Sequence, residues 1–166
     1  MTTNSRWSAA IAGVAATAVI AGAVVAGVRT AHLATDKSNL QHSLSSFERS
    51  ALQAAKTYAV TFATYRYDDL DADFAATEAH SVDPFLTQYR STTDALRETV
   101  TKVKASSSAK VVSAGLASIT ADSAVVDLFL DQSIVNVKSS RTLAQRVEMT
   151  LVRKDGRWLI SRVVLP

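Results

Sequence analysis

The sequence predicts an α+β domain that follows an N-terminal transmembrane helix, with three helices first and then a curved four-stranded antiparallel sheet. Three observations support this prediction. Residues 8–28 contain no charged side chain. Apolar residues recur at helical spacing up to about residue 104, and from Lys110 onward they alternate with polar residues, as in half-buried strands. The 166 residues, of which 48% are apolar, suit a single globular domain.

The composition excludes several classes of protein. The chain has no cysteine, so it has no disulfide framework, thiolate metal site or cysteine nucleophile. Its net charge of +3 is too small to indicate a nucleic-acid partner. The three histidines, His32, His42 and His80, have no metal-ligand spacing, and the sequence contains no glycine-rich phosphate loop. We therefore expect no metal, no cofactor and no nucleic acid.

We expect residues 1–7 to form a short cytoplasmic tail and residues 8–28 to form a transmembrane helix. At about 1.5 Å per residue this run can cross a hydrocarbon core of about 30 Å, and arginine flanks it on both sides. A cleaved signal peptide is the alternative, but its apolar region is shorter, about 7–15 residues. The anchor residues of interest are the two ends and three glycines at small-residue spacing, Ser8, Gly13, Gly22, Gly27 and Val28.

The short N-terminal tail predicts that the N-terminus lies in the cytoplasm and that the rest of the chain lies outside the plasma membrane. We expect a helical stalk over residues 29–48 and an extracytoplasmic domain over residues 49–166. No glycine or proline interrupts the chain between Val28 and Pro84, so a helix can continue out of the membrane. Its apolar stripe comprises Leu40, Leu44, Phe47, Ala51, Ala54, Tyr58 and Tyr65.

Two interpretations of this stripe remain open in its first half. Leu40, Leu44 and Phe47 form either a contact with another subunit close to the membrane or part of the face that packs on the chain's own sheet. The half after Ala51 is expected to pack on the sheet.

Two shorter helices are expected next. Acidic residues beside the first turn predict a helix over residues 69–78, with capping as their role. Asp83 followed by Pro84 predicts the start of the third helix. The expected buried face of this helix comprises Phe85, Tyr89, Leu96, Val100 and Val103. Residues 106–108, all serine, are expected to form a loop.

Four strands complete the expected domain. Alternation predicts strands over residues 111–119, 124–131, 146–152 and 158–165. Residues 154–157 contain Asp-Gly and predict a tight turn between the last two strands.

Charge is distributed unevenly along the sequence. Residues 68–83 contain six acids and no base, whereas residues 138–166 contain seven bases and two acids. The two segments either offer a docking surface to a partner protein or anionic lipid, or neutralise each other across the fold. The residues that we single out for such a surface are Asp68, Asp71, Arg153, Arg157 and Arg162, together with Leu40, Leu44 and Phe47.

Four motifs in this order resemble the Mce-associated membrane proteins of mycobacteria and their relatives, where Mce stands for mammalian cell entry. The motifs are TYRYDDLDAD at residues 64–73, PFLTQY at 84–89, AVVDLFLDQ at 124–132 and RVEMTLVRKDGRWLIS at 146–161. The resemblance implies a cone-shaped nuclear transport factor 2-like fold, which is also seen in the inner-membrane scaffold of type IV secretion systems. It implies an accessory or scaffold role beside an Mce complex that moves lipids across the cell envelope.

The resemblance carries over no catalytic residue, and we expect no enzymatic activity. One alternative is a direct lipid carrier whose sheet encloses an acyl chain between Val126, Leu128, Leu130, Val147, Met149, Leu151, Trp158 and Ile160; the same residues could equally form a filled core. A second alternative is a small isomerase-type enzyme, which needs a carboxylate inside the cone. Its candidates are the acids of residues 68–73 with Tyr65, Tyr67 and Tyr89.

Overall fold

The computed structural model describes residues 45–165. The chain divides into two units, Met1–Ser46 and Phe47–Pro166. Among the described residues, no helix is both long enough and apolar enough to cross a membrane. The predicted anchor and stalk residues lie outside the described part of the chain, namely Ser8, Gly13, Gly22, Gly27, Val28, Leu40 and Leu44.

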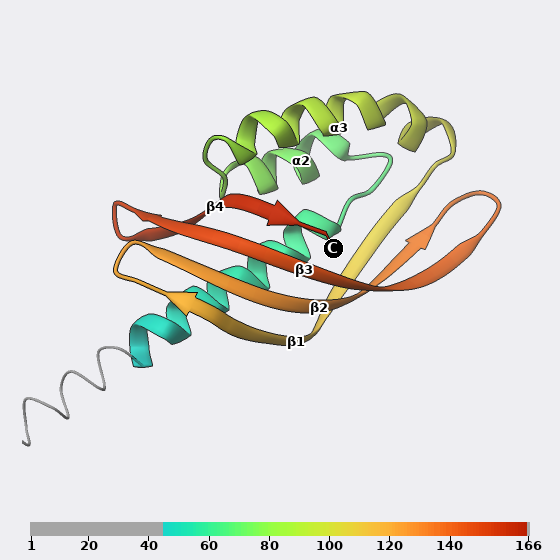
Figure 1. Cartoon of the computed structure of the whole chain (residues 1–166). Helices are drawn as coiled ribbons and strands as arrows, with labels where there is room; N and C mark the ends of the chain where they lie inside the picture. The colour runs from blue at the N-terminus through green and yellow to red at the C-terminus, as the bar shows by residue number, and fades with distance from the viewer. Residues whose placement is uncertain (1–44, 166) are drawn as a thin grey trace, which may run out of the picture. The chain divides into compact units, whose positions relative to one another are not determined.

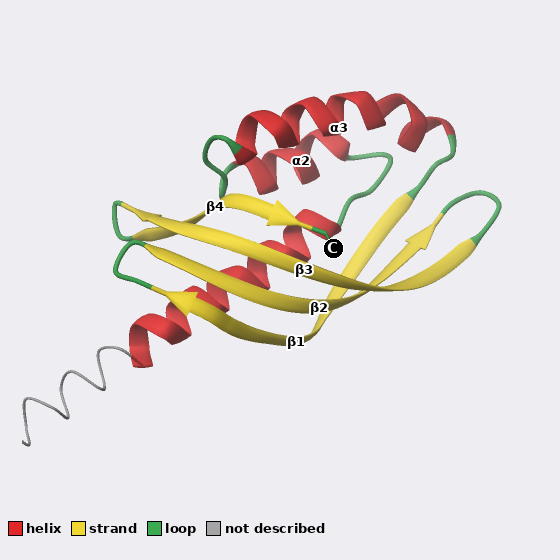
Figure 2. Cartoon of the chain, in the orientation of Figure 1, coloured by secondary structure: helices red, strands yellow, loops and turns green. Residues whose placement is uncertain are grey.

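The described helices precede the described strands. A helix over residues 45–63 is followed by α2 and α3, and then by the strands β1 to β4 (Figures 1 and 2). The bounds are Leu70–Glu78 for α2, Phe85–Lys102 for α3, Ser106–Ile119 for β1, Ser123–Val135 for β2, Ser140–Lys154 for β3 and Arg157–Val164 for β4. The strands pair antiparallel in the order β1-β2-β3-β4. The predicted α+β architecture is therefore confirmed.

A ladder of four alanines joins the first helix to the sheet. Ala51, Ala55, Ala59 and Ala63 recur every four residues and are all buried. They belong to one core cluster with inward-facing residues of three strands, Val126, Leu128, Leu130, Val147, Met149, Leu151 and Ile160. Because alanine carries only a methyl group, the helix backbone can approach the sheet closely and leave the large side chains to the strands.

This face differs from the predicted stripe. Ala54 and Tyr58 are only half-buried, beside the ladder. The helix ends at residue 63, so Tyr65 lies beyond it and forms a β-bridge with Ser107 through backbone bonds of 3.0 and 2.8 Å. The half of the stripe after Ala51 packs against the core as expected, but Ala54, Tyr58 and Tyr65 lie at the margin of the contact, because its centre selects the smallest side chains.

An aromatic cluster connects α2 and α3 to the first helix. Phe62, Phe74, Phe85 and Tyr89 pack with ring centroids 5.6 to 6.2 Å apart. Phe85 and Tyr89 were predicted to be buried, and this is confirmed. Leu96 and Val103 were expected on the same face but are exposed, at 50% and 36%. Thr93 takes the next buried position after Tyr89, at the same spacing of four.

Two strands begin earlier than expected. β1 starts at Ser106, where a loop was predicted. The Ser107 hydroxyl can be buried there because both of its hydrogen-bonding roles are satisfied. It donates to the Ala63 carbonyl (2.7 Å) and accepts from Gln132 Nε2 (2.9 Å). β3 starts at Ser140, so the hairpin of β2 and β3 projects well past the end of β4 (Figure 1). The predicted Asp-Gly turn is confirmed, with positive φ at Asp155 and Gly156.

The alanine ladder yields a stability prediction. Ala55→Leu should lower the free energy of unfolding by about 1–3 kcal/mol, because the larger side chain has no room between helix and sheet. Chemical denaturation of the full chain, followed by circular dichroism, measures this change. Gln53→Leu on the exposed side of the same helix is the control and should alter stability by less than about 0.5 kcal/mol. Equal stability of the Ala55→Leu variant and the wild type would contradict the close packing.

Candidate functional site

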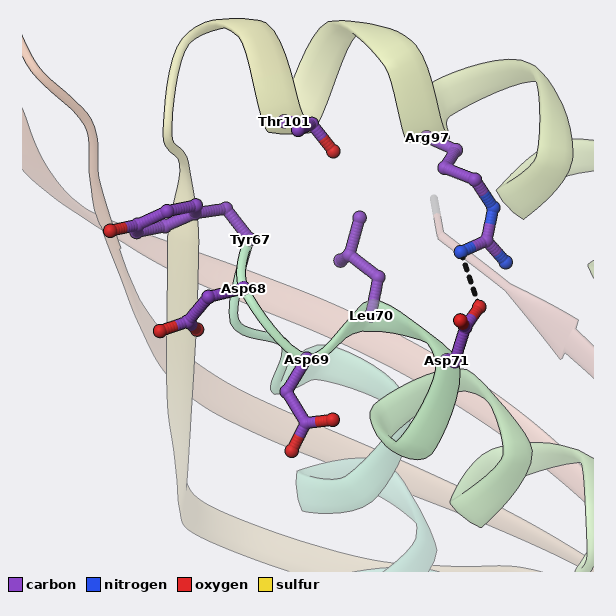
Figure 3. Close-up of a pocket in the computed structure, with 7 residues that line it drawn as sticks. All are labelled: Tyr67, Asp68, Asp69, Leu70, Asp71, Arg97 and Thr101. Atoms are coloured by element: carbon purple, nitrogen blue, oxygen red, sulfur yellow. Dashed lines mark hydrogen bonds and ion pairs between the residues drawn. The ribbon is translucent and has the colours of Figure 1, made fainter.

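The start of α2 and the second half of α3 enclose a shallow hollow, which we call the acidic hollow. It is lined by Tyr67, Asp68, Asp69, Leu70, Asp71, Arg97 and Thr101 and has a volume of about 230 Å³ (Figure 3). Leu70 points toward α3, where Thr101 and Arg97 lie, whereas the side chains of Tyr67 and Asp68 point away on the other side. The predicted surface residues Asp68 and Asp71 thus lie together on this hollow.

Arg66, just before α2, binds two acids at the start of that helix. Its guanidinium contacts Asp69 at 2.6 Å and Asp73 at 3.2 Å, and its backbone N–H donates to the Asp73 carboxylate at 2.8 Å. Asp69 occupies the N-cap position of α2 but makes no side-chain capping bond. The capping role predicted for these acids is therefore wrong for Asp69, because its carboxylate binds Arg66 instead.

Asp71 pairs with Arg97 of α3 at 2.5 Å (Figure 3). The Arg97 guanidinium also lies over the Phe74 ring, 5.5 Å from its centroid. The Asp71 side chain is 90% exposed, so this pair adds little stability and stays accessible to a competing cation. Asp68 is exposed and has no ion-pair partner among the described residues, and its carboxylate points away from Leu70 and α3 at the rim of the hollow.

These acids do not form the interior carboxylate site that an isomerase-type enzyme needs. Asp68, Asp69 and Asp71 are exposed, and Asp73 is bound to Arg66. The polar side chains that are fully buried in the described fold are Thr77, Ser81, Thr93 and Ser107, none of which is a carboxylate or imidazole. Within residues 45–165, no cluster of three His, Asp, Glu or Cys side chains could hold a metal ion. The acidic hollow is an open surface depression in which Asp69 and Asp71 are paired with Arg66 and Arg97.

The predicted basic residues lie on the last two strands. Arg153 and Arg157 flank the β3–β4 turn, and Arg162 lies on β4 opposite Thr150. The Arg153 guanidinium stacks on Phe47, 4.8 Å from the ring centroid, and Phe47 contacts Trp158 at 5.1 Å. The structure thereby brings Phe47 and Arg153 together at the point where the folded unit begins.

The acidic and basic segments do not neutralise each other through ion pairs among the described residues. Three arginines of the helical part pair with the acids instead, Arg66, Arg90 and Arg97. Sequence reasoning missed Arg97 because it lies 26 residues from Asp71. The spacing of Arg66 before Asp69 and Asp73 was a local signal that could have been used.

Asp83 was expected at the cap position of α3 with Pro84 as the first helical residue, but Pro84 occupies the cap position and Asp83 precedes it, binding the first turn from there. Its carboxylate accepts hydrogen bonds from the Thr87 hydroxyl (2.6 Å) and from the Thr87 backbone N–H (3.2 Å). These bonds favour the ionised form and hold the pKa of Asp83 below its usual value. In contrast, burial raises the pKa of Tyr89 and of Tyr65, and the positive charge of Arg141 partly offsets the effect on Tyr65.

Comparison with known proteins assigns a family. No protein family model matches the sequence. The chain is 32% identical over 114 residues to the outer membrane protein Rv1973 of Mycobacterium tuberculosis, an alignment that covers 68% of this chain and 71% of that protein. The chain belongs to the family of Rv1973.

A second relative is more similar but longer. This Rv1973 family member is 36% identical over 117 residues to the uncharacterized protein Rv1362c of Mycobacterium tuberculosis. The alignment covers 69% of this chain and 53% of Rv1362c, so the chain spans about half the length of that relative.

Solved structures share the fold of this Rv1973 family member. The periplasmic domain of DotI superposes with a TM-score of 0.60 at 16% identity, over 69% of this chain and 91% of that one. An IcmL-like type IV secretion system protein of Legionella pneumophila superposes with a TM-score of 0.61 at 10% identity, over 69% and 88%. The likeness to type IV secretion proteins expected from the sequence is confirmed at the level of fold.

The hydrogen bonds of Asp83 yield a pH prediction. Thr87→Val removes the hydroxyl donor, so the pKa of Asp83 should rise toward its usual value. An NMR titration of the carboxyl carbon measures this pKa. Since the folded-state pKa is lowered, the stabilisation is fully present above the unfolded pKa and is lost as the pH falls through the folded value.

The melting temperatures of wild type and Thr87→Val should therefore differ at neutral pH and converge as the pH falls below about 4. Thr92→Val is the control, because its hydroxyl bonds the Gln88 carbonyl on the same helix. An unchanged Asp83 pKa in the Thr87→Val variant would contradict the role of these hydrogen bonds.

Proposed function

We propose that the chain is a single-pass, membrane-anchored accessory protein that supports or stabilises an Mce-type lipid transport complex in the cell envelope. The ordered motifs of the sequence and the two mycobacterial relatives support this proposal. The fold also supports it, because the IcmL-like neighbour is a component of a multiprotein secretion machine. The proposed partners are subunits of the transport complex and the lipid bilayer.

The observation that carries the proposal is a filled interior combined with charged surfaces. The eight residues considered for an acyl-chain cavity are all less than 7% exposed and pack in one core cluster, with the alanine ladder among its members. A chain with this interior acts through contacts on its outside, which fits a scaffold better than a carrier. Among the described residues no Asp, Glu or His is buried as a whole, which supports a non-enzymatic role. One carboxylate oxygen, Oδ1 of Asp127, is buried without a hydrogen-bond partner, and it lies on the face of β2 opposite to Val126 and Leu128.

We further propose that the uncharged run of residues 8–28 anchors the chain in the plasma membrane, with the N-terminus in the cytoplasm. The folded unit then lies on the extracytoplasmic side, as do the periplasmic domains that share its fold. The name of Rv1973 places that relative in the outer membrane. Membrane fractionation therefore forms part of the test.

The test is affinity purification of the tagged full chain in mild detergent from separated plasma-membrane and outer-membrane fractions. We expect recovery from the plasma membrane together with Mce transporter subunits. Recovery without any transporter subunit would contradict the accessory role, and recovery from the outer membrane alone would contradict the proposed location.

The acidic hollow provides a sharper version of this test. Replacing both acids, Asp68→Asn with Asp71→Asn, should lower transporter recovery about two- to fivefold, because exposed charge contacts contribute up to about 1 kcal/mol each. Asp94→Asn, an exposed acid on α3 outside the hollow, is the matched control and should leave recovery unchanged. If the wild type, the double variant and the Asp94→Asn control all recover the same amount of transporter, the acidic hollow is not part of the interface.

A further inference from the structure

Part of β3 has an unpaired edge. β3 pairs with β2 along its whole length, Ser140–Lys154, but its pairing with β4 covers only Glu148–Lys154. The stretch Ser140–Val147, which we call the free edge, therefore has no neighbouring strand on its other side among the described residues. Figure 1 shows β3 continuing past the end of β4 toward the hairpin. Unpaired backbone groups of this kind can pair with another chain.

Hydrogen bonds at both ends of β3 show which backbone groups face outward. The Arg153 N–H donates to the Asp122 carbonyl, and the Ser139 carbonyl accepts from the Asn136 N–H, so odd-numbered residues bond toward β2. No register shift interrupts the pairing of β2 with β3 between these points. The backbone groups of Thr142, Ala144 and Arg146 consequently point to the free edge.

A small apolar hollow, which we call the edge hollow, lies beside this edge. Its lining residues come from the first helix, two strands and the C-terminal segment, Phe62, Ala63, Leu130, Gln132, Gln145, Val147 and Leu165. Its volume of about 190 Å³ is below the 300–1,000 Å³ typical of pockets that enclose a small-molecule ligand. It is suited to a single bulky apolar side chain, projected from a strand that would continue the line of β4 beside Gln145 and Val147.

Charges on the free edge indicate the chemistry of the partner. Arg141 and Arg146 have no ion pair among the described residues. A second copy would have to pair with outward-facing residues opposite one another, for example Ala144 opposite Ala144; because Ser140–Val147 contains no acid, neither arginine would then face a carboxylate. A strand with acidic residues opposite the two arginines pairs favourably instead.

The other edge of the sheet is protected. β1 carries two register irregularities, between Val111 and Ser113 and between Leu116 and Ser118. Such bulges distort an edge and hinder the addition of another strand. The free edge of β3 has no such irregularity.

We propose that the free edge Ser140–Val147 binds an extended segment of a partner protein as an added antiparallel strand. A bulky apolar side chain of that segment fills the edge hollow, and acidic side chains face Arg141 and Arg146. Backbone bonds provide the affinity, and the hollow and the two arginines provide the specificity. The inference deepens the proposed accessory role by naming how a partner is held, but its test needs no transporter, so either can fail alone.

The test uses the full chain in detergent micelles and the synthetic peptide Val-Glu-Leu-Thr-Val-Thr-Glu-Ser. Its antiparallel register places glutamates opposite Arg146 and Arg141 and leucine opposite Gln145, above the edge hollow. Two control peptides have the same length: Val-Val-Leu-Glu-Glu-Thr-Thr-Ser, which breaks the alternation, and a version with lysine in place of both glutamates. Fluorescence anisotropy measures binding, and amide hydrogen exchange locates it.

We expect only the alternating acidic peptide to bind and to slow exchange at Thr142, Ala144 and Arg146. Ala144→Pro, which removes one outward N–H at the edge, should weaken binding about tenfold or more. Ala117→Pro, at an irregularity of β1, is the matched control and should leave binding unchanged. The double variant Arg141→Glu with Arg146→Glu keeps the backbone intact and should shift the preference to the lysine peptide, which tests the proposal even if the proline variant unfolds.

Several results would overturn the proposal. One is equal binding of all three peptides, and another is protection at β1 instead of β3. A third is slow exchange at the same three amides without peptide, together with a dimeric mass in sedimentation, because the free edge would then pair with a second copy. Absence of binding by the acidic peptide would also overturn it.

Discussion

The close contact between the first helix and the sheet determines most features of this domain. Four alanines at a spacing of four residues present a nearly flat helix surface to the inward-facing side chains of β2, β3 and β4. The strands supply the volume, and the helix supplies a narrow backbone that fits against them. As a result the inside of the curved sheet is occupied by protein. Among the described residues, the acidic hollow and the edge hollow are small, whereas a larger open hollow of about 550 Å³ lies beside Phe129, Ala144 and Arg146.

Because this interior is filled, we expect the functional contacts of the protein to lie on its surface. The acids at the start of α2 are bound by Arg66 and Arg97, and Asp68, just before the helix, has no ion pair among the described residues. The basic turn between β3 and β4 packs on Phe47, where the folded unit begins. The projecting hairpin leaves part of β3 unpaired. These three features lie on different elements, which is the arrangement expected of a protein that contacts several partners.

The sequence predicted what depends on local chemistry. Alternation identified all four strands, and Asp-Gly identified the β3–β4 turn, because a positive φ at both central residues requires such residues. The hydrogen bonds of Asp83 at the start of α3 were also predictable, because an aspartate at the start of a helix commonly accepts hydrogen bonds from the first turn. Among the residues singled out for a partner surface, Asp68 and Asp71 line the same hollow, and their role in binding a partner stays a prediction.

What the sequence did not predict depends on tertiary contacts. The sequence analysis chose the larger Tyr58 for the buried face and missed the alanine ladder. The size of an apolar side chain does not indicate how closely a helix approaches a sheet. Ser107 seemed a loop residue because its hydroxyl needs partners, which Ala63 and Gln132 provide from distant parts of the chain. Arg97 and the edge hollow likewise require the folded arrangement to bring their elements together.

The central claim is that the interior is filled and that the protein acts through its surfaces. Native mass spectrometry of the full chain, released from detergent after gentle purification from its own membrane, tests this claim most directly. The account predicts the mass of the polypeptide without a bound lipid at stoichiometric occupancy. One lipid molecule per chain that survives detergent exchange would contradict it, because the core would then have to open around an acyl chain.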